Sequence, residues 1–327
     1  MKKLIENFPA QLTEAIRIGE SAKLSVSKRK ISNVLICGLG GSGIGGTIVT
    51  ELVALVANAP ITVSKGYFIP KFVNENTLVI ISSYSGNTEE TLACLIQALK
   101  RKAKIVCICS GGKVAEIAKK KKLDLIIVPS GMPPRSCLGY SLTQLLFILS
   151  FNKIISGKFK VQLKSSIELL LSEKQNIIAE AKSVAEKILG KTPMIYASTY
   201  FEGIAIRFRQ QLNENAKILC GHQVIPEMNH NELVGWVSGS DKISVIIFRD
   251  KDEFEQNNRR IEINKKIISK YTPHITEIYS KGKSAIEKAI YFIHLGDWAS
   301  VFLAEMKNVD SIEVNVINYL KSELSKK

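Results

Sequence analysis

The first half of the chain alternates short apolar runs with stretches whose apolar residues recur at helical spacing. The apolar runs are short enough to be buried strands, and the stretches between them have the period of amphipathic helices. Strands that alternate with helices predict a parallel sheet joined by right-handed crossovers. The predicted strands are residues 33–37, 61–63, 78–82, 104–109 and 124–128. One predicted helix follows the first strand and ends near residue 56, and the others cover residues 88–100, 113–121 and 135–150.

The second half repeats this organisation. An amphipathic helical pattern covers about residues 162–189, and apolar runs recur at 194–198, 243–248 and 275–279. Residues 151–160 interrupt the pattern and indicate a boundary. We therefore expect an α/β protein with two tandem domains, each a doubly wound, flavodoxin-like parallel sheet flanked by helices. The predicted domains are residues 1–152 and 153–327.

The composition fits two globular domains. The chain has 327 residues, of which 46% are hydrophobic, so a sizeable core can form. No segment approaches the roughly 18 uninterrupted apolar residues of a membrane helix. Glu6 lies where a signal peptide would be apolar. We expect a cytoplasmic protein that associates with no membrane.

The formal net charge of +15 suits an anionic partner. The lysines are scattered apart from one run at residues 119–122, which we expect to end a helix, so we do not expect nucleic-acid binding. The six cysteines form no CxxC pair, and most lie in apolar runs. We expect buried, reduced thiols and no metal site, even where Cys107 and Cys109 share a strand face.

The first predicted strand runs into a glycine-rich loop at residues 38–46. Its GxGxxG pattern is a weak signal for a dinucleotide, because residues 61–65 lack the acidic residue that would hold a ribose. The loop also lacks the Gly-Lys-Ser/Thr of a P-loop. What remains is a strand–turn–helix junction whose backbone N–H groups suit an anion. The alternative is a tight turn that allows close helix packing.

A second loop follows the strand at residues 78–82. Ser83, Ser85 and Thr88 place three hydroxyls around the start of a helix. Hydroxyls, N–H groups and the helix dipole together suit a phosphate monoester. The alternative is ordinary helix capping, although three hydroxyls in six residues exceed what a cap requires.

These segments resemble known proteins. Residues 82–91 resemble the phosphate loop of sugar-isomerase (SIS) domains, and residues 38–46, 134–135, 213–217 and 227–232 extend the match in order. Together they resemble the bifunctional phosphoglucose/phosphomannose isomerase family over nearly the whole chain. The resemblance implies two SIS domains and an enzyme that interconverts glucose 6-phosphate, mannose 6-phosphate or both with fructose 6-phosphate. It also implies a role in glycolysis and gluconeogenesis, no cofactor, and a homodimer with a shared active site.

The resemblance assigns a site residue by residue. Three residues of the first loop would line the sugar phosphate, and three hydroxyls of the second would hold the phosphate. Arg135 would lie over the reacting carbons, Glu214 would be the base, and His230 would open the ring from the other subunit. A lysine in the C-terminal helix matches less closely, because residues 310–311 read Asp-Ser where the family often has Asp-Pro. In that order the residues are Gly40, Gly41, Ser42, Ser83, Ser85, Thr88, Arg135, Glu214, His230 and Lys321.

Chemistry supports three of these roles. Aldose–ketose exchange needs a carboxylate to move a proton, a cation near the enediolate and an acid/base for ring opening. Glu214, Arg135 and His230 supply them without a metal. Spacing alone leaves alternatives for each residue. Glu214 could equally be a solvated acid on a helix, and Arg135 could be a surface residue at the start of a helix. His222 competes with His230 for the role of opening the ring.

Two other functions fit an SIS chain. A sugar-phosphate-binding transcription regulator would need a DNA-binding module, and the roughly 30 residues before the first strand are too few for one. Another SIS enzyme, such as an amino-sugar isomerase, would leave the segments around Glu214 and His230 unexplained. The isomerase is therefore the favoured interpretation.

Overall fold

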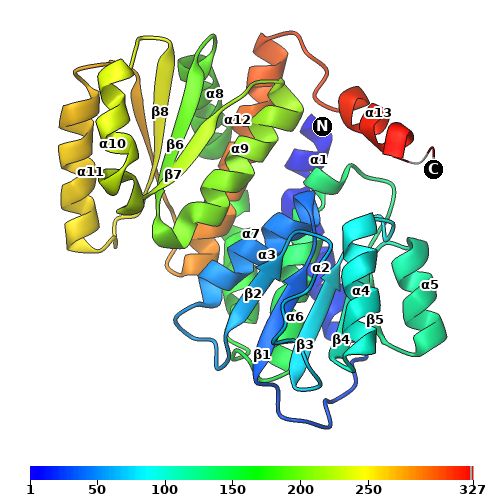
Figure 1. Ribbon diagram of the computed structural model, residues 1–327. Coiled ribbons are helices and arrows are strands. Elements are labelled where there is room, and N and C mark those ends of the chain that lie inside the picture. The colour runs from blue at the N-terminus through cyan, green and yellow to red at the C-terminus, as the bar shows by residue number, and fades with distance from the viewer. Residues whose placement is uncertain (325, 327) are drawn as a thin grey trace. The chain divides into compact units, whose positions relative to one another are not determined.

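The computed structural model describes residues 1–324 and 326, and the chain forms two compact units (Figure 1). The N-terminal unit comprises Glu6–Ser172 and Gly282–Lys288. The C-terminal unit comprises Met1–Ile5, Glu173–Lys281 and Ala289–Lys327. The predicted domain boundary between residues 152 and 153 stays a prediction.

A five-stranded sheet forms the centre of the N-terminal unit. Its order is β2-β1-β3-β4-β5, and all neighbouring strands are parallel, which is the flavodoxin-like order. The predicted doubly wound topology is thus confirmed here, with β1 and β3 adjacent where the order reverses. The strands are β1 (Asn33–Cys37), β2 (Ile61–Ser64), β3 (Thr77–Ser82), β4 (Lys104–Cys109) and β5 (Asp124–Ile127).

Helices cover both faces of this sheet because its central strands are apolar on both sides. Successive strand residues point to opposite faces. Leu35 and Val79 share a buried cluster with residues of α4 and α5. Ile36 points to the other face, where Gly46 brings α3 close to it. The helices are α2 (Phe8–Ser21), α3 (Gly40–Val53), α4 (Glu89–Lys100), α5 (Gly112–Lys121), η1 (Pro134–Ser136), α6 (Leu138–Phe151) and α7 (Phe159–Ser172).

The C-terminal unit contains a second parallel sheet, of order β7-β6-β8-β9. The strands are β6 (Thr192–Ser198), β7 (Gly221–Ile225), β8 (Ile243–Arg249) and β9 (Ile275–Tyr279). The remaining helices of the chain are α1 (Lys2–Glu6), α8 (Lys174–Ile188), η2 (Thr199–Phe201), α9 (Glu202–Ala216), η3 (Glu227–His230), α10 (Glu232–Gly235), η4 (Trp236–Ser238), α11 (Glu255–Ile268), α12 (Ala285–Met306) and α13 (Asn315–Leu324).

Three details differ from the sequence expectations. The helix expected over residues 162–189 is two helices, α7 and α8, that meet at Glu173. The Glu173 carboxylate binds Lys281 at 2.6 Å and Asn176 at 2.8 Å, which stabilises the break. Strand β7 and the N-terminal helices α1 and α2 were not predicted. The basic run at residues 119–122 does end a helix, with Lys122 as the left-handed C-cap of α5.

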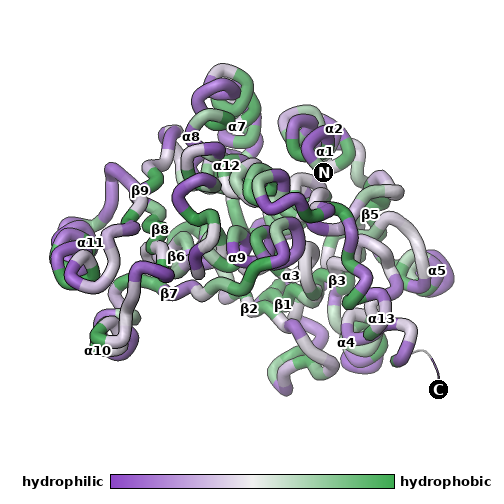
Figure 2. The backbone as a smooth tube through the Cα atoms, turned by 90° about the horizontal axis from the view of Figure 1, so that it is seen from above, coloured by the Kyte–Doolittle hydropathy of each residue, from purple (hydrophilic) through white to green (hydrophobic). Residues whose placement is uncertain are grey.

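Side-chain polarity follows this layering. In Figure 2 the segments at β1 and β3 are mainly hydrophobic, whereas α11 carries many hydrophilic residues.

All six cysteines are free thiols, and burial raises the pKa of Cys107 to about 12 and that of Cys220 to about 11. Over the described residues, no helix is long and apolar enough to cross a membrane.

Candidate functional site

The turn that joins β1 to α3 is rich in glycines, which allow two other segments to approach it. A Cβ at Gly38 would lie 2.7 Å from the carbonyl oxygen of Ser82, where β3 ends. A Cβ at Gly41 would lie 2.8 Å from the carbonyl oxygen of Pro134. Gly40 has a φ of +52°, which favours glycine. The turn therefore packs closely against its neighbours, as expected if its glycines serve close helix packing. The same small residues also keep the first turn of α3 free of bulky side chains.

The loop after β3 presents three hydroxyls at the start of α4. Ser83 is buried and its hydroxyl donates to Thr88 Oγ1 at 3.2 Å. Thr88 occupies the N-cap position of α4, yet within the described chain its side chain makes no capping hydrogen bond. Ser85 is exposed, and its hydroxyl accepts from the backbone N–H of Asn87 at 3.3 Å. Because the N-cap hydroxyl does not cap the helix, this geometry favours an anion at the first turn of α4 over simple capping.

Tyr84 holds the second loop in place. Its backbone N–H donates to Ser42 Oγ at 3.0 Å, which joins the two loops. Its carbonyl accepts from the N–H and the hydroxyl of Ser110, and its phenol accepts from the N–H of Met132 at 3.2 Å. Burial, and then a hydrogen bond with the Cys137 thiol, raise the pKa of Tyr84 above its usual range, so the phenol stays neutral. Sequence reasoning missed this residue, although it lies between two serines of the loop.

Both loops lie at the point where the strand order of the sheet reverses. The glycine turn follows β1 and the hydroxyl loop follows β3, and these two strands are neighbours. Ligands of doubly wound sheets bind in the crevice at the carboxyl ends of such strands. The starts of α3 and α4 converge there, so two helix N-termini favour negative charge at one place.

Arg135 joins this cluster through the short helix η1. The residue is only 4% exposed, and its backbone lies beside Gly41. Gln11 fixes the segment, because its amide nitrogen donates to the carbonyl of Ser136 at 2.8 Å and its amide oxygen accepts from the N–H of Gly139 at 2.9 Å. A buried cation beside the glycine turn suits an anionic ligand, and the surface interpretation of Arg135 is wrong.

Glu214 lies in the last turn of α9 and is half-buried. Polar side chains at every fourth position of α9 bind α12, so α9 is fixed in its rotation about its own axis. The hydrogen bonds join Arg207 to Asp297 (2.6 Å), Gln211 to Asp297 (2.9 Å) and Asn215 to Ser300 (2.9 Å). This ladder therefore also fixes the face of α9 from which the neighbouring Glu214 projects.

The two candidate histidines have different surroundings. His230 ends η3 and is exposed, and the preceding Asn229 anchors the turn through a 2.6 Å hydrogen bond to Asn264. His222 lies on β7, and its Nε2 is 3.9 Å from a carboxylate oxygen of Glu202. His230 is therefore presented outward on a fixed turn, whereas His222 faces an acid of its own unit.

Lys321 lies on α13, as expected for the C-terminal helix, and it is exposed. The same helix exposes apolar side chains, including Val316, Tyr319 and Leu320. Within its own unit α13 therefore leaves both its lysine and its apolar residues uncovered.

The structure groups the predicted residues in two sets. The N-terminal unit brings seven of them together around the two loops and η1. The C-terminal unit places the other three on separate elements. The first set is Gly40, Gly41, Ser42, Ser83, Ser85, Thr88 and Arg135, and the second is Glu214, His230 and Lys321.

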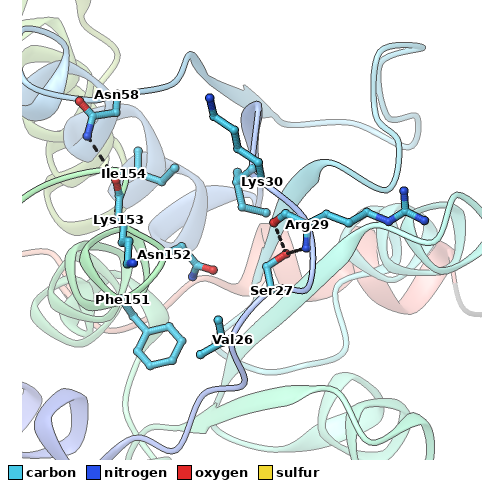
Figure 3. A pocket seen from close by; sticks show the side chains of 10 residues that line it. Val26, Ser27, Arg29, Lys30, Asn58, Phe151, Asn152, Lys153 and Ile154 are labelled. Carbon is cyan, nitrogen blue, oxygen red and sulfur yellow. Dashed lines mark hydrogen bonds between the residues drawn. The ribbon is translucent and has the colours of Figure 1, made fainter.

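A separate cavity of about 400 Å³ lies at the amino edge of the same sheet (Figure 3). It is bounded by the segment that enters β1 and by the end of α6, so it faces away from the carboxyl ends that carry the two loops. Its lining includes Arg29, Lys30, Phe151 and Lys153. None of the predicted site residues lines it.

No metal site is evident in the part of the chain that the structure describes. There, no group of three or more His, Cys, Asp or Glu side chains is arranged to hold a metal ion. The side chains of the two sets are hydroxyls, a carboxylate, an imidazole and cations.

Comparison with known proteins identifies the two halves. Residues 27–143 match the SIS domain, and residues 177–324 match the bacterial phospho-glucose isomerase C-terminal SIS domain. A solved structure of a putative phosphosugar isomerase from Clostridium difficile shares the fold, with a TM-score of 0.80 and 16% identity over 100% of this chain and 98% of that one. The expected α/β fold of two SIS domains is confirmed.

Curated relatives match over most of their length. A bifunctional phosphoglucose/phosphomannose isomerase of Caldicellulosiruptor bescii is 35% identical over 99% of both chains. One of Aquifex aeolicus is 36% identical over 90% of both chains. A D-glucosamine-6-phosphate 4-epimerase of Sulfolobus acidocaldarius is 33% identical over 86% of this chain and 85% of its own.

Proposed function

Because the chain belongs to the bifunctional phosphoglucose/phosphomannose isomerase family, we propose that it interconverts fructose 6-phosphate with glucose 6-phosphate, mannose 6-phosphate or both. The reaction opens the sugar ring and moves a proton between adjacent carbons through an enediol. The observation that carries the proposal is the pair of loops at the β1/β3 reversal point, where the N-cap hydroxyl of α4 is left for a ligand.

The N-terminal unit binds the sugar phosphate in this proposal. Ser85 and Thr88 donate to the phosphate, Ser83 does so once its hydroxyl turns away from Thr88, and the dipole of α4 adds to their attraction. Gly40, Gly41 and Ser42 line the sugar. Their lack of bulk supports this role, because the substrate must approach the backbone closely.

Arg135 and Glu214 perform the proton transfer. Glu214 takes the proton from one carbon and returns it to the neighbouring carbon. Arg135 stabilises the negative charge that develops on the enediolate oxygens, and its burial strengthens that attraction. No metal is needed for either step.

His230 opens the ring, and it reaches the site from the second subunit of a homodimer. Its exposed position on an anchored turn supports this role. Val234 and Val237, which follow it in sequence, are also exposed apolar residues that a second subunit would cover. Lys321 assists proton transfer from α13. The enzyme acts in the cytoplasm, in glycolysis and gluconeogenesis, without a nucleic-acid or membrane partner.

A second candidate activity is epimerisation of an amino-sugar phosphate, because the Sulfolobus acidocaldarius relative is nearly as similar as the isomerases. Glucosamine 6-phosphate is therefore a necessary comparison substrate. Formation of an epimer without any ketose–aldose exchange would favour this second activity.

The decisive experiment incubates the purified protein with fructose 6-phosphate in D₂O and follows the products by proton NMR. The enediol route predicts glucose 6-phosphate, mannose 6-phosphate or both, with deuterium at C2, and a chelator should not change the rate. Absence of both aldoses, with no deuterium in the recovered ketose, would exclude the proposed reaction.

A further inference from the structure

The end of α9, where the proposed base lies, is held by two lysine side chains. The last carbonyls of a helix have no partner within the helix and need an external donor. Lys217 Nζ donates to the carbonyl of Glu214 at 2.6 Å. Lys307 Nζ donates to the carbonyls of Ala216 and Lys217, at 2.9 and 3.3 Å. Both cations also oppose the negative end of the helix dipole.

Lys217 makes a second set of contacts that Lys307 does not. Its ammonium donates to the carbonyl of Glu313 at 2.6 Å and lies 3.7 Å from a carboxylate oxygen of the same residue. Glu313 belongs to the connector between α12 and α13. Its other carboxylate oxygen accepts from the N–H of Asn315, the first residue of α13. One ammonium group therefore joins the main chain at Glu214 to the start of the helix that carries Lys321.

The connector is itself ordered around this contact. Asp310 Oδ1 accepts from the N–H of Ile312 at 2.7 Å, which forms a turn just before Glu313. The Lys217 and Glu313 side chains are 29% and 33% exposed, so water screens the pair only in part. Two of the three ammonium donors of Lys217 are held by main-chain carbonyls, and the Glu313 carboxylate balances its charge.

We propose that Lys217 is a positioning residue that fixes the end of α9 and the start of α13 in one geometry. This inference rests on the proposed roles of Glu214 and Lys321. The Arg207–Asn215 ladder fixes α9 only as far as Asn215, and a last helical turn without partners frays. The Lys217 contacts hold the main-chain carbonyl of Glu214, extend the order past Asn215 to the C-cap of the helix, and link that end to the connector before α13.

Lys217→Met tests the clamp, because it removes the ammonium and keeps a long side chain at the left-handed C-cap. Misplacement of a catalytic group by about 1 Å costs on the order of 100-fold in rate, so we expect kcat to fall about 10- to 100-fold. The KM for the sugar phosphate should change little, since the phosphate loops lie in the other unit. Backbone amides of residues 315–324 should exchange with D₂O faster than in the wild type.

Three further variants separate positioning from general stability. Lys307→Met removes a cation from the same helix end but leaves the Glu313 contact, so it should not speed exchange in α13. Lys217→Arg should restore part of kcat. Glu313→Gln removes only the 3.7 Å ion pair and keeps both carbonyl contacts of Lys217, so it should lower kcat less than Lys217→Met, and the double variant should be little worse than Lys217→Met alone.

The outcomes are distinct. Wild-type kcat in Lys217→Met, a loss that falls entirely on KM, or unchanged exchange of residues 315–324 would each overturn the clamp. If Lys217→Met does not fold, Glu313→Gln tests the ion pair to the α13 connector with both carbonyl contacts retained, and unchanged exchange of residues 315–324 in that variant would overturn the link to α13. Failure of the proposed function would instead appear as wild-type turnover in Glu214→Gln, while the exchange experiment would still decide whether Lys217 orders α13.

Discussion

The two sheets share a topology but differ at the point where their strand order reverses. In the N-terminal unit this point lies between β1 and β3, and in the C-terminal unit it lies between β6 and β8 (Figure 1). The turn after β1 is rich in glycine, whereas the turn after β6 contains Phe201, which packs on Phe292 with ring centroids 5.5 Å apart. The Thr199 hydroxyl in that turn donates to the carbonyl of Ile225 at 3.3 Å.

The other strand at the second reversal point, β8, also has its charged end residue bound by side chains of its own unit. Arg249 ends β8, and its buried guanidinium binds Glu262, Glu277 and Asn258. The first reversal point has small residues and hydroxyls, and the second has aromatic packing and closed ion pairs. A doubly wound sheet therefore provides the place for a site, and the side chains at that place decide whether a ligand can enter.

The largest expected effect lies at the carboxyl end of α9. Glu214→Gln removes the only proposed base and should lower kcat by about 10² to 10⁴, because general-base catalysis contributes that much. Binding of the sugar phosphate, measured by calorimetry with fructose 6-phosphate, should remain. Glu202→Gln, at the other end of the same helix, is the matched control and should retain most of the activity. Wild-type turnover in Glu214→Gln would remove the residue from the mechanism.

The buried ladder between α9 and α12 should dominate the stability of the C-terminal unit. Asp297 is 5% exposed, and burial raises its pKa even though Arg207 and Gln211 oppose the shift. Asp297→Asn leaves the Arg207 guanidinium without its carboxylate, which should lower the free energy of unfolding by about 3–5 kcal/mol. In the N-terminal unit, Gln144→Leu breaks a neutral buried bond to Ala15 and should cost only about 1–2 kcal/mol. Urea unfolding measures both, and equal losses would contradict the argument.

The ladder also shows where the sequence becomes uninformative. Strand runs, helix periods and small residues predicted the parallel sheets and the two loops, because burial in such a sheet requires continuous apolar strands. Arg207, Gln211 and Asn215 instead have the spacing of a solvated helix face, and only the partner helix shows that they are buried. Strand β7 was missed because His222 and Gln223 interrupt its apolar character at the edge of a sheet.

The roles of the remaining candidates could be assigned only by resemblance. Nothing in the sequence around Glu214 or His230 distinguishes a catalytic side chain from a solvated one, since catalysis depends on what the fold brings near it. The hydroxyl loop is different. Its three hydroxyls follow a strand and precede a helix, so the local pattern by itself predicts both the position and the chemistry of the proposed phosphate site.

The next largest expected effect is a loss of sugar-phosphate affinity at the first reversal point but not at the second. Ser85→Ala and Thr88→Ala should each weaken binding of fructose 6-phosphate by roughly 1.5–3 kcal/mol, because each hydroxyl is proposed to donate to a charged phosphate. Thr199→Ala alters the equivalent turn of the second sheet and should leave the affinity unchanged. Calorimetric titration measures all three, with thermal unfolding to verify the fold. Unchanged affinity in the Ser85→Ala/Thr88→Ala double variant would mean that this loop serves only α4.

A mixing experiment locates the histidine. Glu214→Gln and His230→Ala subunits are each inactive, but a mixed dimer regains one complete site if His230 crosses between subunits. Random pairing makes about half of the dimers mixed, so the co-refolded sample should recover roughly a quarter of the wild-type activity per site. Native mass spectrometry verifies that mixed dimers form. If they form and remain inactive, the shared site is wrong, although the isomerase assignment is unaffected.

The smallest expected effect concerns Glu253, which lies beside the closed ion pairs of the second reversal point. Its side chain is 4% exposed, and neither carboxylate oxygen accepts a hydrogen bond from any described residue. Burial raises the pKa of Glu253 to about 7, although Arg249, 3.7 Å away, opposes the shift. Because the folded pKa lies above the unfolded one, the folded state binds more protons, and stability falls as the pH rises toward 7. Glu253→Gln cannot ionise, so it should match the wild type near about pH 4, below the unfolded pKa, and exceed its unfolding free energy by on the order of 1 kcal/mol near about pH 8, since water screens part of the effect. A difference that does not change with pH would show that the carboxylate stays charged, and that this crevice tolerates an anion after all.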